Sequence, residues 1–145
     1  SFVMLLQRSQ TTFITFDTNS INELLEYCKQ EFSGAILGGS SSTREQLLNV
    51  WKQTGVKPKE LENLTETPTE LLEQWGWFLD LNDSRSSNGY GYNPISFSDM
   101  YAYFRLQGVN PHLWEVSLIR RLDRVVLGVY AERTKQETEK AKRKQ

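Results

Sequence analysis

The sequence has one cysteine, Cys28, and one histidine, His112. A disulfide needs two cysteines, so none forms within this chain. A zinc site built in the usual way, with three or four Cys and His ligands from one chain, is excluded as well. Histidine-based catalysis needs a partnered nucleophile or carboxylate, and no recognisable signature accompanies His112. The net charge of −1 gives no global electrostatic case for nucleic-acid or membrane binding.

Long hydrophobic runs and phosphate-binding glycine motifs are also missing. A membrane span needs about 20 apolar residues, and residues 2–6 are far too short. The glycines at Gly38-Gly39 and at Gly89 and Gly91 lack the spacing and the Lys-Ser/Thr pair of a phosphate loop. Three scattered aspartates, at positions 80, 83 and 99, do not form a metal-binding pattern. The sequence therefore predicts no catalytic residue, no cofactor and no metal site.

The sequence does carry a substantial set of apolar residues and well-marked helix starts. The 145 residues, 38% hydrophobic and 12% aromatic, suit one domain, or a small domain with an appendage. Ser20 with Glu23 fits a capping box, Thr67-Pro68 and Asn110-Pro111 each pair a cap with an initial proline, and Ser96 is a further cap. Helices are predicted near residues 20–33, 43–54, 68–81, 96–107 and 111–135.

The N-terminal residues have a pattern typical of strands, whereas the rest of the chain has patterns typical of helices. Residues 2–6 are apolar and residues 12–16 are β-branched and aromatic, which favours two short strands. The predicted fold is mainly α, a small helical bundle with a short N-terminal β-hairpin, so α+β at the N-terminus. We expect three parts: a hairpin-plus-helix region at 1–64, a helical module at 65–131 and a charged helical tail at 132–145. That tail carries six Lys or Arg and three Glu, a net charge of +3, which leaves −4 for the remainder.

The aromatic residues divide between a predicted core and a predicted surface. At 100° per residue, Trp75 and Phe78 share one side of a helix while Trp77 turns away. We expect Trp77 and the loop residues Tyr90 and Tyr92 to be partly exposed and available to a partner. The predicted core residues are Trp75, Phe78, Met100, Phe104, Trp114, Ile119 and Leu122. Cys28 is predicted to be a buried, inert thiol and His112 a surface or capping residue.

Three stretches carry a family resemblance. They are Trp77-Phe78-Leu79-Asp80-Leu81, Arg85 to Phe97 with its Gly89-Tyr90-Gly91 centre, and Trp114-Glu115-Val116 running to Arg120-Arg121-Leu122-Asp123. Together they resemble a short module of tail assembly chaperones of long-tailed bacteriophages, over about residues 75–125. The chain departs from that pattern in having tyrosine at 90 and 92, where phenylalanine is common, and Leu113 before Trp114, where proline is common.

The resemblance implies a non-enzymatic helper in tail morphogenesis. Such proteins coat the tape measure protein, recruit tail tube subunits and are absent from the finished virion, so the implied location is the host cytoplasm. A homo-oligomer is possible, and no membrane or nucleic-acid partner is expected. The partner-binding residues that we predict are Trp77, Tyr90, Tyr92, Tyr103, Arg120 and Arg121.

Two other functions stay open. The chain can be a structural virion protein of the tail or neck, and presence in mature particles would separate this hypothesis from the first. It can also be a small DNA-binding regulator that uses a helix-turn-helix or its basic C-terminal helix. A recognition helix needs exposed basic residues near its start, whereas Arg120, Arg121 and Arg124 come well after Asn110. An enzyme is the least expected class.

Overall fold

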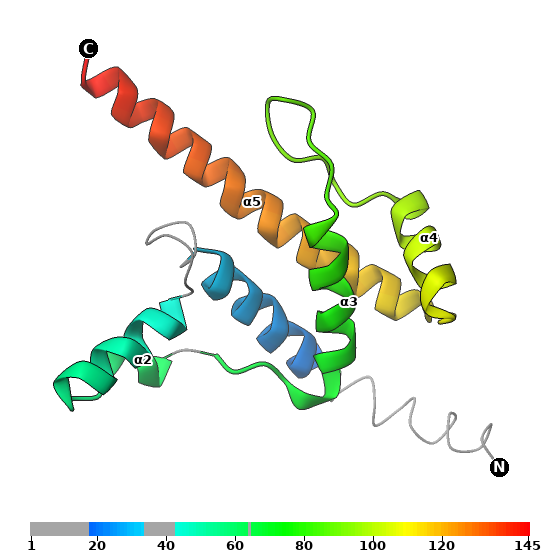
Figure 1. The fold of residues 1–145 in the computed structure, drawn as a ribbon, viewed down its shortest axis with the longest axis horizontal. Helices are drawn as coiled ribbons and strands as arrows, with labels where there is room; N and C mark the ends of the chain where they lie inside the picture. The colour runs from blue at the N-terminus through cyan, green and yellow to red at the C-terminus, as the bar shows by residue number, and fades with distance from the viewer. Residues whose placement is uncertain (1–17, 34–42, 64) are drawn as a thin grey trace.

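The computed structural model describes residues 18–33, 43–63 and 65–145, and this part of the chain is built from helices (Figure 1). They are a helix of residues 18–33, α2 (Thr43–Thr54), the 3₁₀ turns η1 (Lys59–Asn63) and η2 (Thr69–Leu71), α3 (Leu72–Asp83), α4 (Phe97–Gln107) and α5 (Leu113–Arg143). The predicted helices are therefore all present, and the last one is longer than predicted.

The β part of the predicted fold class is wrong. The described residues contain no β-strand, and their one β-type pairing is an isolated antiparallel bridge between Ser87 and Tyr92, so the fold is mainly α. Residues 2–16, on which the hairpin was predicted, lie outside the described residues. The prediction used two short runs, and periodicity alone cannot separate a strand from a helix over such lengths. A two-stranded hairpin is also marginal without further strands, and the described elements offer none.

Capping interactions explain where the later helices begin and end. The Ser96 hydroxyl accepts a hydrogen bond from the backbone N–H of Asp99 at 3.0 Å, and α4 ends at Gly108 in the left-handed conformation, with φ of 66°. Helix α5 begins after His112 rather than at Pro111, since the Glu115 carboxylate accepts from the His112 backbone N–H at 2.9 Å. His112 is thus an exposed capping residue, as predicted.

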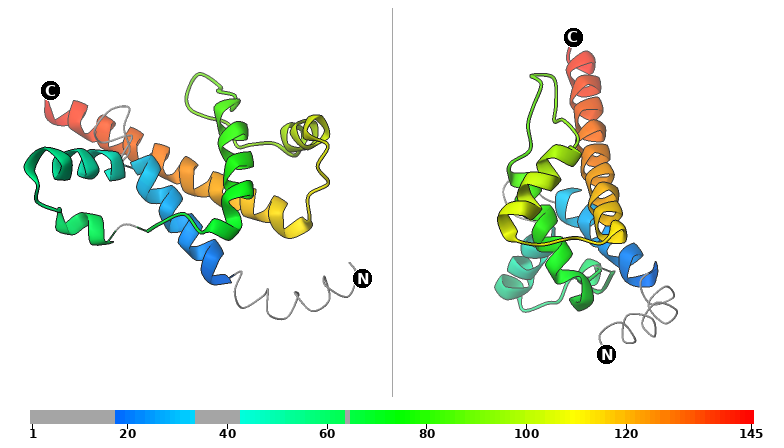
Figure 2. Two further views of the ribbon diagram at one scale, coloured as in Figure 1. Left: turned by 60° about the horizontal axis from the view of Figure 1, so that its bottom comes forward. Right: turned by 90° about the vertical axis from the view of Figure 1, so that its right-hand side faces the viewer.

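The helix of residues 18–33, α3, α4 and α5 share one hydrophobic core. Figures 1 and 2 show α3 between α4 on one side and the helix of residues 18–33 on the other, with α5 running past all three. The fully buried side chains are those of Leu24, Cys28, Phe78, Leu118, Ile119, Leu122 and Val126. Burial raises the pKa of the Cys28 thiol to about 12, so the thiol is neutral and unreactive, as predicted.

The predicted core is largely confirmed, but the prediction for Trp77 is wrong. Phe78, Met100, Phe104, Ile119 and Leu122 are buried, and Trp75 and Trp114 are half-buried against them. Trp77 is only 8% exposed, because α4 covers that face of α3 and the Phe104 ring meets the indole edge-on at a centroid distance of 5.0 Å. Helix α3 is buried on two sides, and a single apolar stripe does not predict the second.

The predicted boundary at residue 64 stays a prediction. The helix of residues 18–33 contributes Ile21, Leu24 and Cys28 to the core of the C-terminal module, and the Thr65 N–H donates to the side-chain oxygen of Gln30 at 3.0 Å. In contrast, α2 packs against η1 and leaves Trp51 40% exposed. Helix α5 is about 46 Å long by its 31 residues, and its side chains beyond Tyr130 are exposed. None of the helices in the described part is long and apolar enough to cross a membrane.

Truncating Phe78 tests this packing. Phe78→Ala should lower the free energy of unfolding by about 3–5 kcal/mol, because it leaves a cavity where α3 meets its neighbours. Leu106→Ala, at an 87% exposed position of α4, is the control and should change stability by less than about 0.5 kcal/mol. Urea unfolding followed by circular dichroism measures both. Equal effects of the two substitutions would contradict the observed core.

Candidate partner-binding surface

The segment between α3 and α4 is a long loop with a defined hairpin-like shape. The Asn93 N–H donates to the Ser86 carbonyl at 2.9 Å, and the Asn88 N–H donates to the Gly91 carbonyl at 3.1 Å. The Asn88 side-chain oxygen accepts from the N–H groups of residues 90 and 91 at 2.9 and 3.0 Å. Gly89 has φ of 88°, a conformation that suits glycine. The loop therefore presents Tyr90 at its tip, and this residue is 98% exposed.

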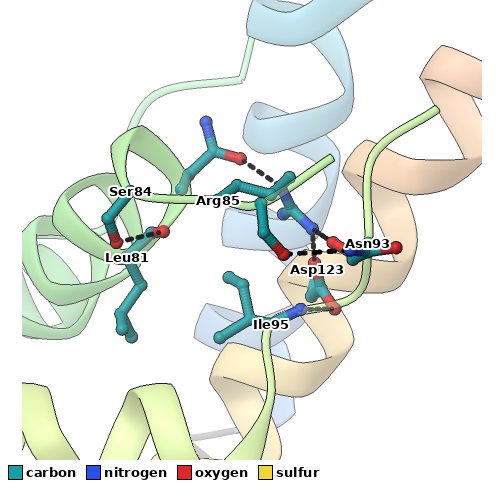
Figure 3. Close-up of polar contacts among 8 residues, drawn as sticks. Leu81, Ser84, Arg85, Asn93, Ile95 and Asp123 are labelled. Atoms are coloured by element: carbon teal, nitrogen blue, oxygen red, sulfur yellow. Dashed lines mark hydrogen bonds and ion pairs between the residues drawn. The ribbon is translucent and has the colours of Figure 1, made fainter. Parts of the chain in front are cut away.

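A buried ion pair attaches the base of this loop to α5 (Figure 3). Arg85 Nη1 lies 2.5 Å from Asp123 Oδ1, and the two side chains are only 2% and 7% exposed. Arg85 also donates to the Asn93 carbonyl at 2.9 Å and, through Nε, to the Asn82 side-chain oxygen at 3.1 Å. The second carboxylate oxygen of Asp123 accepts from the Ile95 N–H at 3.1 Å. Both ends of the loop are thus connected to one carboxylate on α5.

The ion pair is not fully compensated by hydrogen bonds. Arg85 Nη2 is buried without a hydrogen-bond partner in the described part, and Asp123 Oδ1 accepts no well-directed hydrogen bond, although Arg85 Nη1 is close. Buried charges of this kind contribute little net stability as a pair, but removing one partner leaves the other charge uncompensated. The pair therefore fixes the position of the loop more than it adds to the overall stability.

A groove about 820 Å³ in volume lies between the loop and the C-terminal half of α5, and we name it the tyrosine groove. The Tyr92 ring lies 4.9 Å from the Tyr130 ring between centroids, and Tyr130 lies 6.3 Å from Phe32. Burial, and then Tyr92, raises the pKa of Tyr130, so this phenol is neutral near pH 7. The lining side chains include Phe32, Tyr90, Tyr92, Leu127, Tyr130, Arg133 and Glu137.

Of the six predicted partner-binding residues, the structure brings only Tyr90 and Tyr92 together in this groove. Trp77 is buried between α3 and α4. The Tyr103 hydroxyl donates to the Asp80 carboxylate at 2.5 Å, and burial with this contact raises the pKa of Tyr103 to about 12. The binding roles of these residues stay predictions.

The two predicted arginines lie on exposed positions of α5. The Arg120 guanidinium lies over the Phe97 ring, 4.7 Å from its centroid, and so links α5 to the start of α4. A second hollow, of about 630 Å³, lies between α4 and the start of α5 and includes Phe97, Tyr101 and Val116. Phe97 and Tyr101 are 61% and 68% exposed, so α4 offers a second apolar surface.

A second buried polar contact was not predicted. The Gln74 side chain on α3 donates to Glu115 Oε2 on α5 at 2.7 Å, while the other oxygen of Glu115 caps that helix. Both residues are 6% exposed. Glu115 and Asp123 belong to the stretch that carries the family resemblance, and that was the available signal for their importance.

The described residues contain no group of three His, Cys, Asp or Glu side chains able to hold a metal ion. The geometry offers instead a folded helical module with an aromatic groove. A family model described as phage tail assembly chaperone matches residues 50–128, which is more than half of the chain. The chain belongs to the phage tail assembly chaperone family.

This membership confirms the resemblance found over about residues 75–125, and the match also reaches upstream into α2. No match was found among curated proteins or among solved structures. Within this tail assembly chaperone, Arg85, Glu115 and Asp123 have structural roles: they connect α3, the loop and α5.

Substitutions at the Arg85–Asp123 pair should lower stability when they leave one buried charge without its partner. Arg85→Met and Asp123→Asn should each lower the free energy of unfolding by about 3–5 kcal/mol, because each leaves one buried charge alone. The double variant leaves no charge, and the amide oxygen that replaces the carboxylate in it can still accept from the Ile95 N–H.

The double variant should therefore be more stable than either single variant. Urea unfolding of the four proteins gives the comparison. Single variants within about 1 kcal/mol of the parent, or a double variant that loses the sum of both, would contradict a buried coupled pair.

Proposed function

We propose that this tail assembly chaperone is a non-enzymatic binding protein that holds the tape measure protein and recruits tail tube subunits during tail morphogenesis in the host cytoplasm. Family membership supports the role in tail assembly. The observation that supports the proposed mechanism is the tyrosine groove, which is open to solvent and lies between a fixed loop and a long helix.

The groove suits a helical client. Aromatic rings supply a large contact area while losing little side-chain entropy, and Tyr90 and Tyr92 are 98% and 54% exposed, so they are accessible. An amphipathic helix would place apolar anchors at positions i, i+3 or i+4, and i+7 against the tyrosine groove. Because the groove is open and uses few aromatic contacts, binding is reversible, as release of a client requires.

The other predicted residues contribute in different ways under this proposal. Arg120, Arg121 and Tyr103, together with the apolar surface of α4, are the contacts that we assign to a second partner such as a tube subunit. Trp77 is buried, so its contribution is indirect: it packs α3 against α4 and keeps that surface in place.

Capture from infected cells tests the proposal. Tagged parent protein should retain the phage tape measure protein, identified by mass spectrometry. Tyr90→Ala/Tyr92→Ala should reduce that capture about tenfold or more, since it removes the exposed aromatic contacts of the groove. Val56→Ala/Leu72→Ala removes two exposed apolar side chains that line neither surface, so it is the matched control and should leave capture unchanged.

Two results would contradict the proposal. One is equal capture by the groove variant and the parent, with both proteins folded by circular dichroism. The other is stoichiometric presence of the chain in purified mature virions, which would make it a structural protein of the tail or neck.

A further inference from the structure

The last turns of α5 form a basic end that no other described element neutralises. Lys140, Lys142, Arg143 and Lys144 are exposed, and no described carboxylate forms an ion pair with them. Cations near a helix C-terminus are favourable for the helix dipole, but only by a few tenths of a kcal/mol each at exposed sites. That effect does not require four of them within five residues.

The basic end follows directly on the tyrosine groove. The last residues of α5 that line the groove are Arg133, Thr134 and Glu137. Along a continuous helix, Lys144 lies about 10 Å beyond Glu137. Figure 1 shows α5 continuing past the loop and away from the other helices, so a client lying in the groove can extend along it.

The charges within the groove are already paired. Arg133 Nε lies 2.9 Å from Glu137 Oε1, four residues away on the same helix. The groove itself therefore adds no net charge, and its other lining residues are apolar, aromatic or uncharged. The cluster of four cations at positions 140–144 begins one turn later, while the rest of the chain carries the opposite net sign, −4 outside residues 132–145.

We propose that the helix which occupies the tyrosine groove is acidic next to its apolar anchors, and that the basic end of α5 binds those carboxylates. This inference rests on the proposed function and specifies the chemistry of the client. The negative remainder of the chain disfavours an acidic helix elsewhere, whereas the end of α5 attracts it, so charge sets the position of the client along α5.

Binding of designed helical peptides to the full chain tests the inference. The probe peptide has a central stripe of Leu and Phe at helical spacing and Glu-rich turns at both ends, and it carries a fluorophore. Two matched peptides have Gln or Lys in place of each Glu. Fluorescence anisotropy at roughly 50 mM salt should show the Glu peptide binding about tenfold more tightly than the Gln peptide, with the Lys peptide weakest. The preference should shrink at roughly 500 mM salt.

Two variants connect that preference to the basic end. Lys140→Gln/Lys142→Gln/Arg143→Gln/Lys144→Gln should abolish the Glu preference and leave binding of the Gln peptide unchanged. Lys135→Glu/Glu139→Lys keeps the net charge of the tail and exchanges two exposed residues one turn apart, so the preference should persist. Circular dichroism checks that both variants keep their helix content.

The outcomes separate the two proposals. Equal binding of all three peptides, or a preference that survives neutralisation of the basic end, would overturn this inference while the groove function stands. Failure of every peptide to bind would count against the groove itself. Tight binding of a labelled DNA duplex by the parent, lost in the neutralised variant, would show that the basic end binds nucleic acid. That result would also overturn the inference.

Discussion

The buried ion pair between Arg85 and Asp123 is the contact on which the rest of this surface depends. It joins the first residues of a long loop to the middle of α5, and the same carboxylate accepts from the Ile95 N–H where the loop ends. A loop of this length has a large conformational freedom unless its ends are fixed. Fixing both ends to one helix allows short internal hydrogen bonds around Asn88 to define the tip.

The groove is a consequence of that attachment. With the loop fixed, Tyr92 packs on Tyr130. The loop then forms one side of the tyrosine groove and α5 forms the other. The core beneath it, centred on Phe78 and Ile119, supplies a rigid base. The buried polar side chains of Arg85 and Asp123 connect elements of the fold, and the groove above them presents exposed tyrosine rings.

Local signals predicted the helices well and the contacts between them poorly. The Ser96 cap and the apolar spacing of α5 depend on neighbours in the sequence, so they can be read directly. The Arg85–Asp123 pair joins residues far apart in the chain, and no periodicity reveals it. Trp77 was misassigned for the same reason, because the helix that covers it comes later in the sequence. The exposure of Tyr90 and Tyr92 was predictable from their place in a Gly-rich loop. The groove that they line was not predictable, because its other wall is a helix far along the chain.

The central claim is that the client lies between the loop and α5. Site-specific photo-crosslinking in phage-infected cells tests it most directly, with a benzophenone amino acid placed at position 90 or, as a control on an exposed position of α4, at position 106. The account predicts that position 90 crosslinks to a helical segment of the tape measure protein and that position 106 does not. Crosslinks to that segment from position 106 alone would place the client on α4 and contradict the account.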